Sequence, residues 1–286
     1  MATIGVQAMM LKDSFSEIGA FETLRKVSAI GYNAVEISQI PMTAENVAEL
    51  DRSRTELGMD IAALSVAMEM PKGRPGDSLK DHFDKIVDDA KRLDSRLLRI
   101  GMLPFPAMKS IEAVIDFAKE ANGYAERLSE HGIGLYYHNH HIEFAKFDGK
   151  YMLDIIAENS PAMGMEIDVH WVQRGGLDPV RTIGKYAGRT AMVHLKDYRI
   201  GELPEAAFGM LETGDLPGFM QAFKNVVQFA EVGEGNLDFP SIIDAAQAAG
   251  AQYLLVEQDE LYGRTVWDAL QTSYDNLVAM GHAKLF

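Results

Sequence analysis

Eight short apolar segments recur along the chain, and most are separated from the next by a longer helical pattern. Short apolar runs bounded by turn residues predict buried strands, while apolar residues at three- and four-residue steps predict helices. Thr43 suits a helix N-cap, and Gly31 and Gly58 are placed to end helices. The predicted strands lie at residues 3–9, 33–38, 60–68, 96–102, 133–140, 163–169, 190–197 and 252–259, and the clearest helices at 17–30, 43–58, 77–95 and 110–132.

This alternation predicts an α/β fold, a single (β/α)8 TIM barrel. Strands joined by helical crossovers lie parallel with right-handed connections, and eight such units close a barrel. An open doubly wound sheet is the structural alternative, but no glycine-rich phosphate turn follows the first strand. The chain has 286 residues, of which 47% are hydrophobic. Because barrels of this size commonly form one domain, we expect one domain over residues 1–286.

The segment of residues 198–239, after the seventh predicted strand, is longer than a loop that joins a strand to the next helix in a barrel. Within them, LPGFMQAFKNVVQFAEVGEG is consistent with a short helix and one strand. We interpret the segment as an insertion over one face of the barrel, serving as a lid or as an interface element. In the second case the chain would form a homo-oligomer.

Composition excludes several classes of function. The chain has no cysteine, which excludes disulfides, thiolate zinc sites and a cysteine nucleophile. The formal net charge of -15 argues against nucleic acid and anionic membranes as partners. The amino terminus lacks the basic and then apolar pattern of a signal peptide, and no apolar run is long enough for a bilayer. We therefore expect a cytoplasmic location.

Polar side chains gather at the predicted carboxyl ends of the strands, where TIM barrels carry their chemistry. Adjacent strands lie about 4.8 Å apart, so side chains from strands five to eight can converge on one ion. Oxygen ligands with one imidazole suit Mn²⁺, Mg²⁺ or Co²⁺, with Zn²⁺ as another option. Our predicted ligands are Glu143, Asp168, His194 and Glu257. The other strand-end candidates are Glu36, Arg99, His138, His140, His141, Glu166, His170, Lys196, Asp197, Asp259 and Glu260.

Each of these residues also has a simpler explanation. His194 can be a core histidine, and a carboxylate such as Asp259 can cap the next helix. Four consecutive strand ends carrying Asp, Glu or His nevertheless favour a site. Glu166 shares a strand face with Asp168 and is expected beside it or inside the barrel. Trp171 can form a wall against the apolar face of a sugar.

Five segments of this chain resemble motifs of one known family: YHNHHIEF at 137–144, EIDVHW at 166–171, VHLKD at 193–197, EVGEGNLDFPSII at 231–243 and LLVEQDE at 254–260. The chain resembles the sugar phosphate isomerase/epimerase family of xylose-isomerase-like TIM barrels, in its YHNHxxEF subgroup. That family includes ketose 3-epimerases, inosose dehydratases and the endonuclease IV type of DNA repair enzyme. The resemblance extends over nearly the whole chain. The net negative charge of the chain argues against the endonuclease branch.

The resemblance implies one divalent metal held by strands five to eight, with Asp168, His194 and Glu257 as ligands. Many members carry a strand-five glutamate in an ENH motif, where this chain has HNH. His138 stands at the place of that glutamate, so the fifth-strand ligand is either His138 or Glu143. We favour Glu143, because it keeps the ligand set rich in carboxylates, and Mn²⁺ as the ion.

The resemblance also implies proton transfer next to a carbonyl, through an enediolate that the metal stabilises. Glu257 and Glu143 are the first candidates for moving that proton, with His138 or His140 as replacements. The resemblance suggests a small-molecule sugar or polyol substrate and favours isomerisation or epimerisation of a ketose or keto-sugar. Elimination from an inosose or 3-keto-glycoside comes second, ahead of a non-catalytic sugar-binding barrel or a nuclease. The expected substrate-binding residues are Glu36, His140, His170, Lys196 and Trp171.

Overall fold

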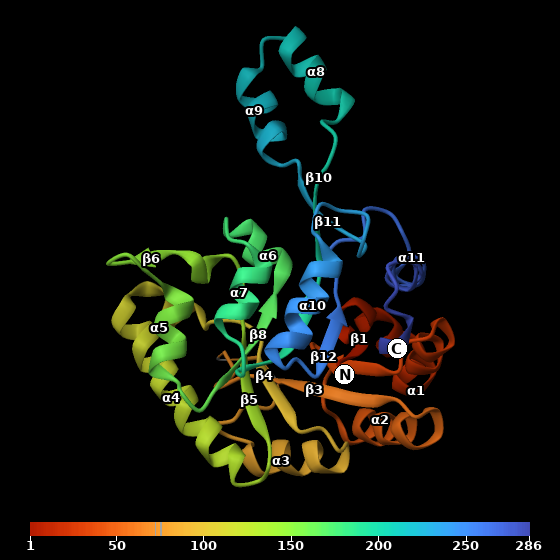
Figure 1. Ribbon diagram of the computed structural model, residues 1–286, viewed down its shortest axis with the longest axis vertical. Helices are drawn as coiled ribbons and strands as arrows, with labels where there is room; N and C mark the ends of the chain where they lie inside the picture. The colour runs from red at the N-terminus through yellow and green to blue at the C-terminus, as the bar shows by residue number, and fades with distance from the viewer. Residues whose placement is uncertain (72, 75) are drawn as a thin grey trace.

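Eight parallel strands form a closed barrel in the computed structural model, which describes residues 1–71, 73–74 and 76–286. Each barrel strand lies within one of the predicted apolar segments, which confirms the predicted fold (Figure 1). Around the barrel the strands follow the order β1-β12-β9-β8-β5-β4-β3-β2. They are β1 Thr3–Gln7, β2 Ala34–Ile37, β3 Asp60–Val66, β4 Leu97–Ile100, β5 Gly134–His138, β8 Gly164–Asp168, β9 Thr190–Leu195 and β12 Tyr253–Val256.

Helices surround the barrel. Thr43 caps α2 as predicted, since its hydroxyl accepts a hydrogen bond from the backbone of Asn46. Helix α3 starts later than predicted because Ser78 pairs with Ala67, which keeps that segment beside the end of β3. The α-helices of this ring are α1 Lys12–Ile30, α2 Ala44–Leu57, α3 Phe83–Arg92, α4 Ile111–Ser129, α5 Met152–Asn159, α6 Val169–Arg174, α7 Pro179–Lys185, α10 Phe239–Ala249 and α11 Val266–Ala279.

Short 3-10 helices η1 Ala8–Leu11, η2 Phe105–Lys109, η3 Ile142–Phe144 and η4 Ala283–Leu285 complete this layer, with a small hairpin of β6 Lys146–Phe147 and β7 Lys150–Tyr151. In the part of the chain that the structure describes, no helix is long and apolar enough to cross a membrane.

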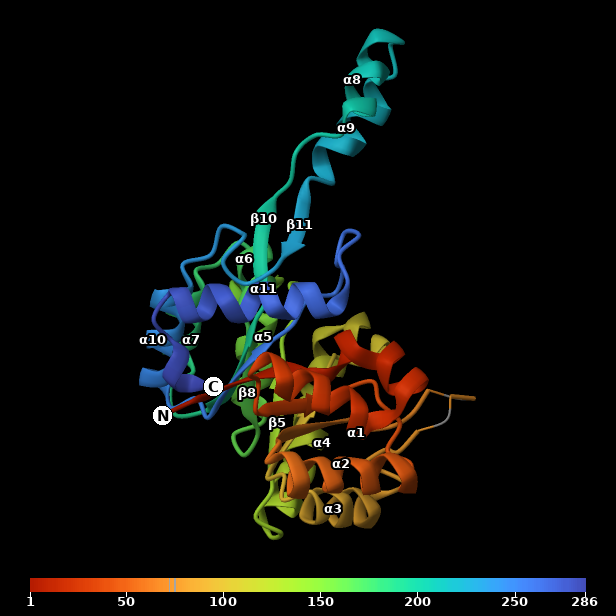
Figure 2. The ribbon, with the colours of Figure 1, turned by 90° about the vertical axis from the view of Figure 1, so that its right-hand side faces the viewer.

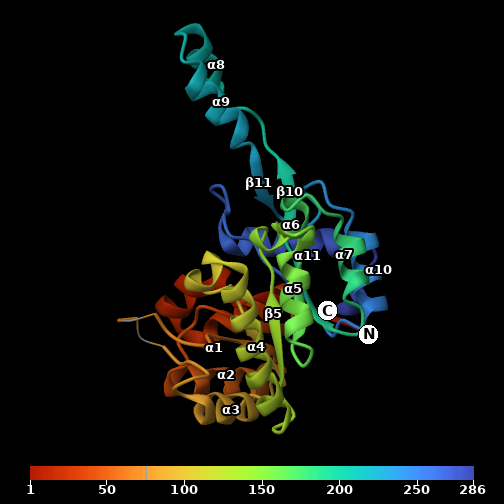
Figure 3. The same cartoon turned by 90° about the vertical axis from the view of Figure 1, so that its left-hand side faces the viewer.

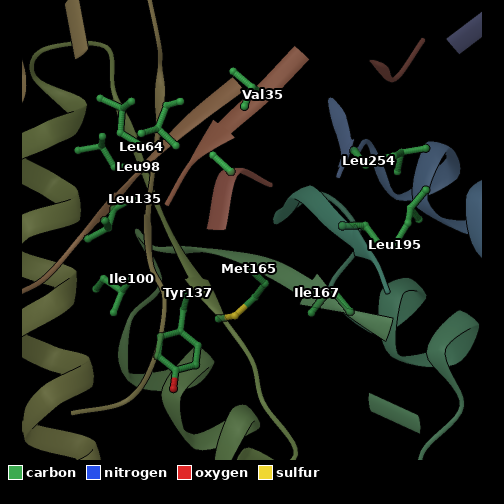
Figure 4. Close-up of a cluster of buried hydrophobic side chains, with 14 of the residues drawn as sticks. Val35, Leu64, Leu98, Ile100, Leu135, Tyr137, Met165, Ile167, Leu195 and Leu254 are labelled. Carbon is green, nitrogen blue, oxygen red and sulfur yellow. The ribbon is translucent and has the colours of Figure 1, made fainter. Parts of the chain in front are cut away.

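The alternation of side chains along each strand separates an apolar layer from a polar interior. One set of alternate residues packs between the strands and the helices and forms the main hydrophobic core (Figure 4). The other set points into the barrel. At its amino-terminal end Leu97, Met192 and Leu255 form a small apolar plug with Tyr136. Gly164 is required there, because any side chain would collide with the Tyr136 ring.

An arm leaves the barrel directly after β9, at the predicted insertion (Figures 1, 2 and 3). It consists of β10 Asp197–Ile200, α8 Glu205–Glu212, α9 Leu216–Lys224 and β11 Val227–Ala230, with β10 and β11 paired antiparallel. The sequence suggested only one helix and one strand in this segment. The structure has two of each, because Gly214 turns the chain with a positive φ and Asp215 caps a second helix.

Candidate metal centre at the barrel mouth

Four buried side chains converge where β5, β8, β9 and β12 end. These strands are consecutive neighbours in the barrel, so their inward-facing terminal residues share one space. One ligand atom from each residue lies within 4.8 Å of the others. The four residues are His138, Asp168, His194 and Glu257.

The spacing of the four atoms fits a metal ion. His194 Nδ1 lies 2.7 Å from Glu257 Oε2, 3.1 Å from His138 Nε2 and 3.8 Å from Asp168 Oδ2. Ligand atoms bound tetrahedrally at about 2.1 Å would lie roughly 3.4 Å apart. The buried Asp168 Oδ2 lies 3.5 Å from His138 Nε2 and 3.2 Å from Lys196 Nζ. Burial lowers the pKa of His138 to about 3, which keeps its ring neutral and available as a ligand.

The far side of the His194 ring is held by two carboxylates. His194 Nε2 lies 3.0 Å from Glu36 and 3.1 Å from Glu166, which directs Nδ1 toward the other three ligand atoms. Arg99 lies 2.6 Å from Glu36 and 3.3 Å from Glu166, and so balances part of their charge. Burial and the charge of Glu36 raise the pKa of Glu166 to about 7. This buried network occupies the middle of the barrel, where TIM barrels usually place apolar layers.

Glu257 is fixed from three directions. Gln7 donates to Oε1 at 2.9 Å, while His194 and the Lys196 ammonium lie 2.7 and 2.8 Å from Oε2. Lys196 also lies 3.2 Å from Asp168 and 3.0 Å from Asp259. Burial raises the pKa of Glu257, but the charges of Lys196 and His194 outweigh it and hold the pKa well below its usual range. Glu257 is therefore ionised at neutral pH.

Glu143 lies outside this cluster. Its two carboxylate oxygens accept hydrogen bonds from the Tyr137 hydroxyl at 2.6 Å and from the backbone of His140 at 2.8 Å. Tyr137 belongs to the layer between strands and helices, so Glu143 lies behind the barrel wall and braces the loop after β5. The geometry thus groups His138, and not the favoured Glu143, with the other three predicted ligands.

A wall of rings stands beside the cluster. His170 stacks on Phe229 of β11 with ring centroids 4.3 Å apart, and His140 lies 5.3 Å from Trp171. Among the described residues, His140 Nδ1, His170 Nε2 and Trp171 Nε1 are buried without hydrogen-bond partners. Burial lowers the pKa of both histidines to about 4, so their neutral rings can donate to or accept from substrate hydroxyls. His141 stacks on Trp171 from outside.

Apart from Glu143, the predicted site residues therefore divide into three groups. His138, Asp168, His194, Glu257 and Lys196 meet at the cluster, and His140, His170 and Trp171 stand beside it. Glu36 lies beneath it, with both carboxylate oxygens already paired inside the protein. Sequence reasoning missed Gln7 and Phe229. The alternation of side chains along β1 places Gln7 on one face of that strand, and this signal could have revealed it. Phe229 lies beside the mouth only because the arm brings β11 there.

Comparisons with known proteins agree with this barrel. A family model described as the xylose isomerase-like TIM barrel matches residues 24–270. The rhizopine catabolism protein MocC of Rhizobium meliloti is 30% identical over 170 residues, which is 59% of this chain and 48% of MocC. The match thus spans about half the length of this curated relative.

Solved structures share the fold at low sequence identity. A sugar phosphate isomerase/epimerase from Parabacteroides distasonis has a TM-score of 0.71 at 20% identity, covering 97% of this chain and 98% of that one. An L-ribulose 3-epimerase gives 0.67 at 15%, covering 100% and 96%. The apo form of the E. coli 3-keto-D-glucoside 4-epimerase YcjR gives 0.65 at 15%, covering 98% and 99%.

Proposed function

Because the chain belongs to the xylose isomerase-like TIM barrel family, we propose that it is a metal-dependent isomerase or epimerase of a ketose or related keto-sugar. The observation that carries this proposal is the buried cluster of four ligand atoms at the barrel mouth. Burying charged groups is costly even when they are paired, so a buried cluster of ionisable side chains is expected where its charge has a use.

The proposed ligands are His138, Asp168, His194 and Glu257. Burial lowers the pKa of His194, but the charges of Glu166, Glu36 and Glu257 outweigh it and raise this pKa well above its usual range, so metal binding would release a proton from the ring. Two neutral imidazoles and two carboxylates would then balance one divalent cation. A set with two nitrogen ligands suits Mn²⁺, Co²⁺ or Zn²⁺ better than Mg²⁺, which prefers oxygen. When bound, the ion would supply Lewis acidity that stabilises negative charge developing on a substrate oxygen.

One of the ligands and the groups around the cluster bind the sugar and move its proton. Glu257, kept ionised by Lys196, is the proposed acceptor of a carbon-bound proton next to the carbonyl. Lys196 faces the same carboxylate and can stabilise negative oxygen. His140 and His170 offer their unpaired ring nitrogens to hydroxyls, and Trp171 covers the apolar face of the ring.

We propose an unphosphorylated substrate. Lys196 and Arg99, the buried cations at and beneath the cluster, are each already paired with two or more carboxylates. Neither is free to compensate the two charges of a phosphate group. Neutral sugars instead match the unpaired ring nitrogens of the aromatic wall.

A second candidate is a lyase or dehydratase acting on an inosose or a 3-keto-glycoside. Its support is the fold likeness to a probable 3-DHS dehydratase from Bacillus anthracis, which has a TM-score of 0.64 at 12% identity. Both reactions begin with removal of a proton next to a carbonyl, so the same residues serve either outcome.

The experiment is incubation of the metal-loaded protein in D2O with a panel of ketoses, inososes and 3-keto-glycosides. NMR should show deuterium at the carbon next to the carbonyl, together with an epimer, an isomer or an elimination product. Turnover without deuterium incorporation would contradict the proton-transfer proposal. Binding of a sugar without exchange or turnover would favour a non-catalytic sugar-binding barrel.

A further inference from the structure

The arm of residues 197–230 carries a concentration of exposed apolar side chains. Among the described residues, twelve large apolar side chains are exposed, and six of them belong to the arm. Phe208, Leu216 and Phe223 are 52, 57 and 53% exposed, and α9 has no buried residue in the described structure. The six are Ile200, Phe208, Leu211, Leu216, Met220 and Phe223. Monomeric proteins rarely expose large apolar patches, so this concentration of apolar side chains in the arm points to an interaction surface.

The root of the arm is rigid. Four residue pairs join β10 to β11. The carboxylate of Asp197 accepts hydrogen bonds from the backbone of Gly233 at 2.9 Å, Gly235 at 2.8 Å and Leu237 at 3.2 Å. The Tyr262 hydroxyl accepts another from the backbone of Phe229 at 3.1 Å. These bonds fix the direction in which the arm leaves the barrel, and in this arrangement its apolar tip stays exposed within one chain.

A second apolar surface lies at the barrel mouth, away from the arm. Phe105 in η2 is 76% exposed and Met102 is 45% exposed, both just after β4. The arm follows β9, which is separated from β4 by two strands of the eight-stranded barrel. The arm root and the η2 segment, residues 101–110, therefore lie on nearly opposite sides of the mouth.

The two surfaces have complementary charge. The tip of the arm, residues 201–226, carries the acidic residues Glu202, Glu205, Glu212 and Asp215 and one basic residue, Lys224. The η2 segment carries Lys109 as its single charged residue. The acidic tip is repelled by anionic lipids and nucleic acid, whereas the η2 segment offers it the positive charge of Lys109.

We propose that two copies of this chain exchange arms, so that the tip of each arm lies on the η2 segment of the other copy and covers its mouth. A second copy has one arm tip and one η2 segment, as the first copy does. A two-fold axis between the copies therefore places each tip on the η2 segment of the other copy. The assembly does not depend on which reaction the barrel performs.

The dimensions agree with such an exchange. The four residues of β10 and the nine of α9 each extend about 13 Å, which places the tip on the order of 25 Å beyond the rim. Half-exposed aromatic or large aliphatic side chains leave roughly 100 Å² each to be buried. The six arm residues with Met102 and Phe105 thus approach the roughly 800 Å² per partner of a specific interface.

The first test is sedimentation velocity of the full-length protein at micromolar concentration. Wild type should sediment as a dimer. Phe208→Asp/Leu211→Asp in the arm and Phe105→Asp in η2 should each raise the dimer dissociation constant ~100-fold or more. Val278→Asp, an exposed position on α11 outside both surfaces, should leave the dimer intact. A monomeric wild type, or a dimer that survives both sets of substitutions, would overturn the proposal.

The second test uses the absence of native cysteine. One chain carrying both Leu211→Cys and Phe105→Cys should, on oxidation, form a dimer linked by disulfides between chains. A disulfide within one chain would show that the arm closes over its own mouth instead. Preferential linking of Leu211→Cys to a second Leu211→Cys chain, with none to Phe105→Cys, would show tip-to-tip pairing. Either result would overturn the exchange.

Discussion

At the scale of single residues, Glu257 has two proposed roles, as a metal ligand and as the acceptor of the substrate proton. It offers one oxygen to the metal cluster while Gln7 and Lys196 fix its orientation and charge. Glu257→Gln keeps the shape and the hydrogen bond from Gln7 but removes the negative charge. Proton exchange in D2O should therefore fall by at least ~100-fold, with the fold retained by circular dichroism. Exchange at the wild-type rate would remove Glu257 from the proposed mechanism.

His170 provides a pH test of the buried aromatic wall. An unfolded histidine takes up a proton near pH 6.5, whereas burial lowers the pKa of His170 to about 4. Between these values the unfolded state binds more protons, so this histidine costs stability as the pH falls. His170→Asn should gain up to about 3 kcal/mol in free energy of unfolding relative to wild type from pH 6.5 to 4.

The measurement is urea unfolding of both metal-free proteins across that range. Using the difference between the two proteins cancels the titration of groups that they share. A constant difference between pH 6.5 and 4 would contradict a neutral, buried His170.

At the scale of elements, Asp197 joins the arm to the barrel. Asp197→Ala leaves the backbone N–H groups of Gly233, Gly235 and Leu237 without their acceptor, at about 1–3 kcal/mol for each group that stays buried. Hydrogen exchange at these amides should accelerate. Asp215→Ala is the matched control, because Asp215 caps α9 at the tip and its loss should cost about 1 kcal/mol without affecting the root. Unchanged protection in Asp197→Ala would contradict a rigid root.

The elements also show what sequence could and could not predict. The barrel strands were predictable because each buries an apolar face between the barrel and its helices, as at Leu98 and Ile167. The outer half of the arm was not predictable in detail. In the described structure its large apolar residues stay mostly exposed, so their pattern does not report burial there.

The fifth-strand ligand shows a similar limit. In the sequence, His138 and Glu143 both lie close enough to the end of β5 to serve as its metal ligand. The preference of the ion for oxygen ligands alone favours the Glu143 carboxylate. The choice depends on side-chain direction: His138 ends β5 facing inward, whereas η3 turns Glu143 toward Tyr137. Such a turn of three residues leaves no periodic signal in the sequence.

At the scale of the whole molecule, metal binding should couple to stability, because the ligands come from four strands that meet only in the folded barrel. A cation at one hundred times its dissociation constant adds about 2.7 kcal/mol to the free energy of unfolding. For a chain of this size that is a rise in Tm of roughly 4–5 °C. Calorimetry should show this rise for wild type and lose it for His138→Ala.

The metal content of purified wild type, His138→Ala and Glu143→Gln tests the central claim most directly. Elemental analysis after reconstitution with Mn²⁺, Co²⁺ or Zn²⁺ should find one ion per chain in wild type and in Glu143→Gln. His138→Ala should lose most of it. Full retention of the ion by His138→Ala with its loss in Glu143→Gln would contradict the proposed centre, and so would a wild type that binds none of these ions.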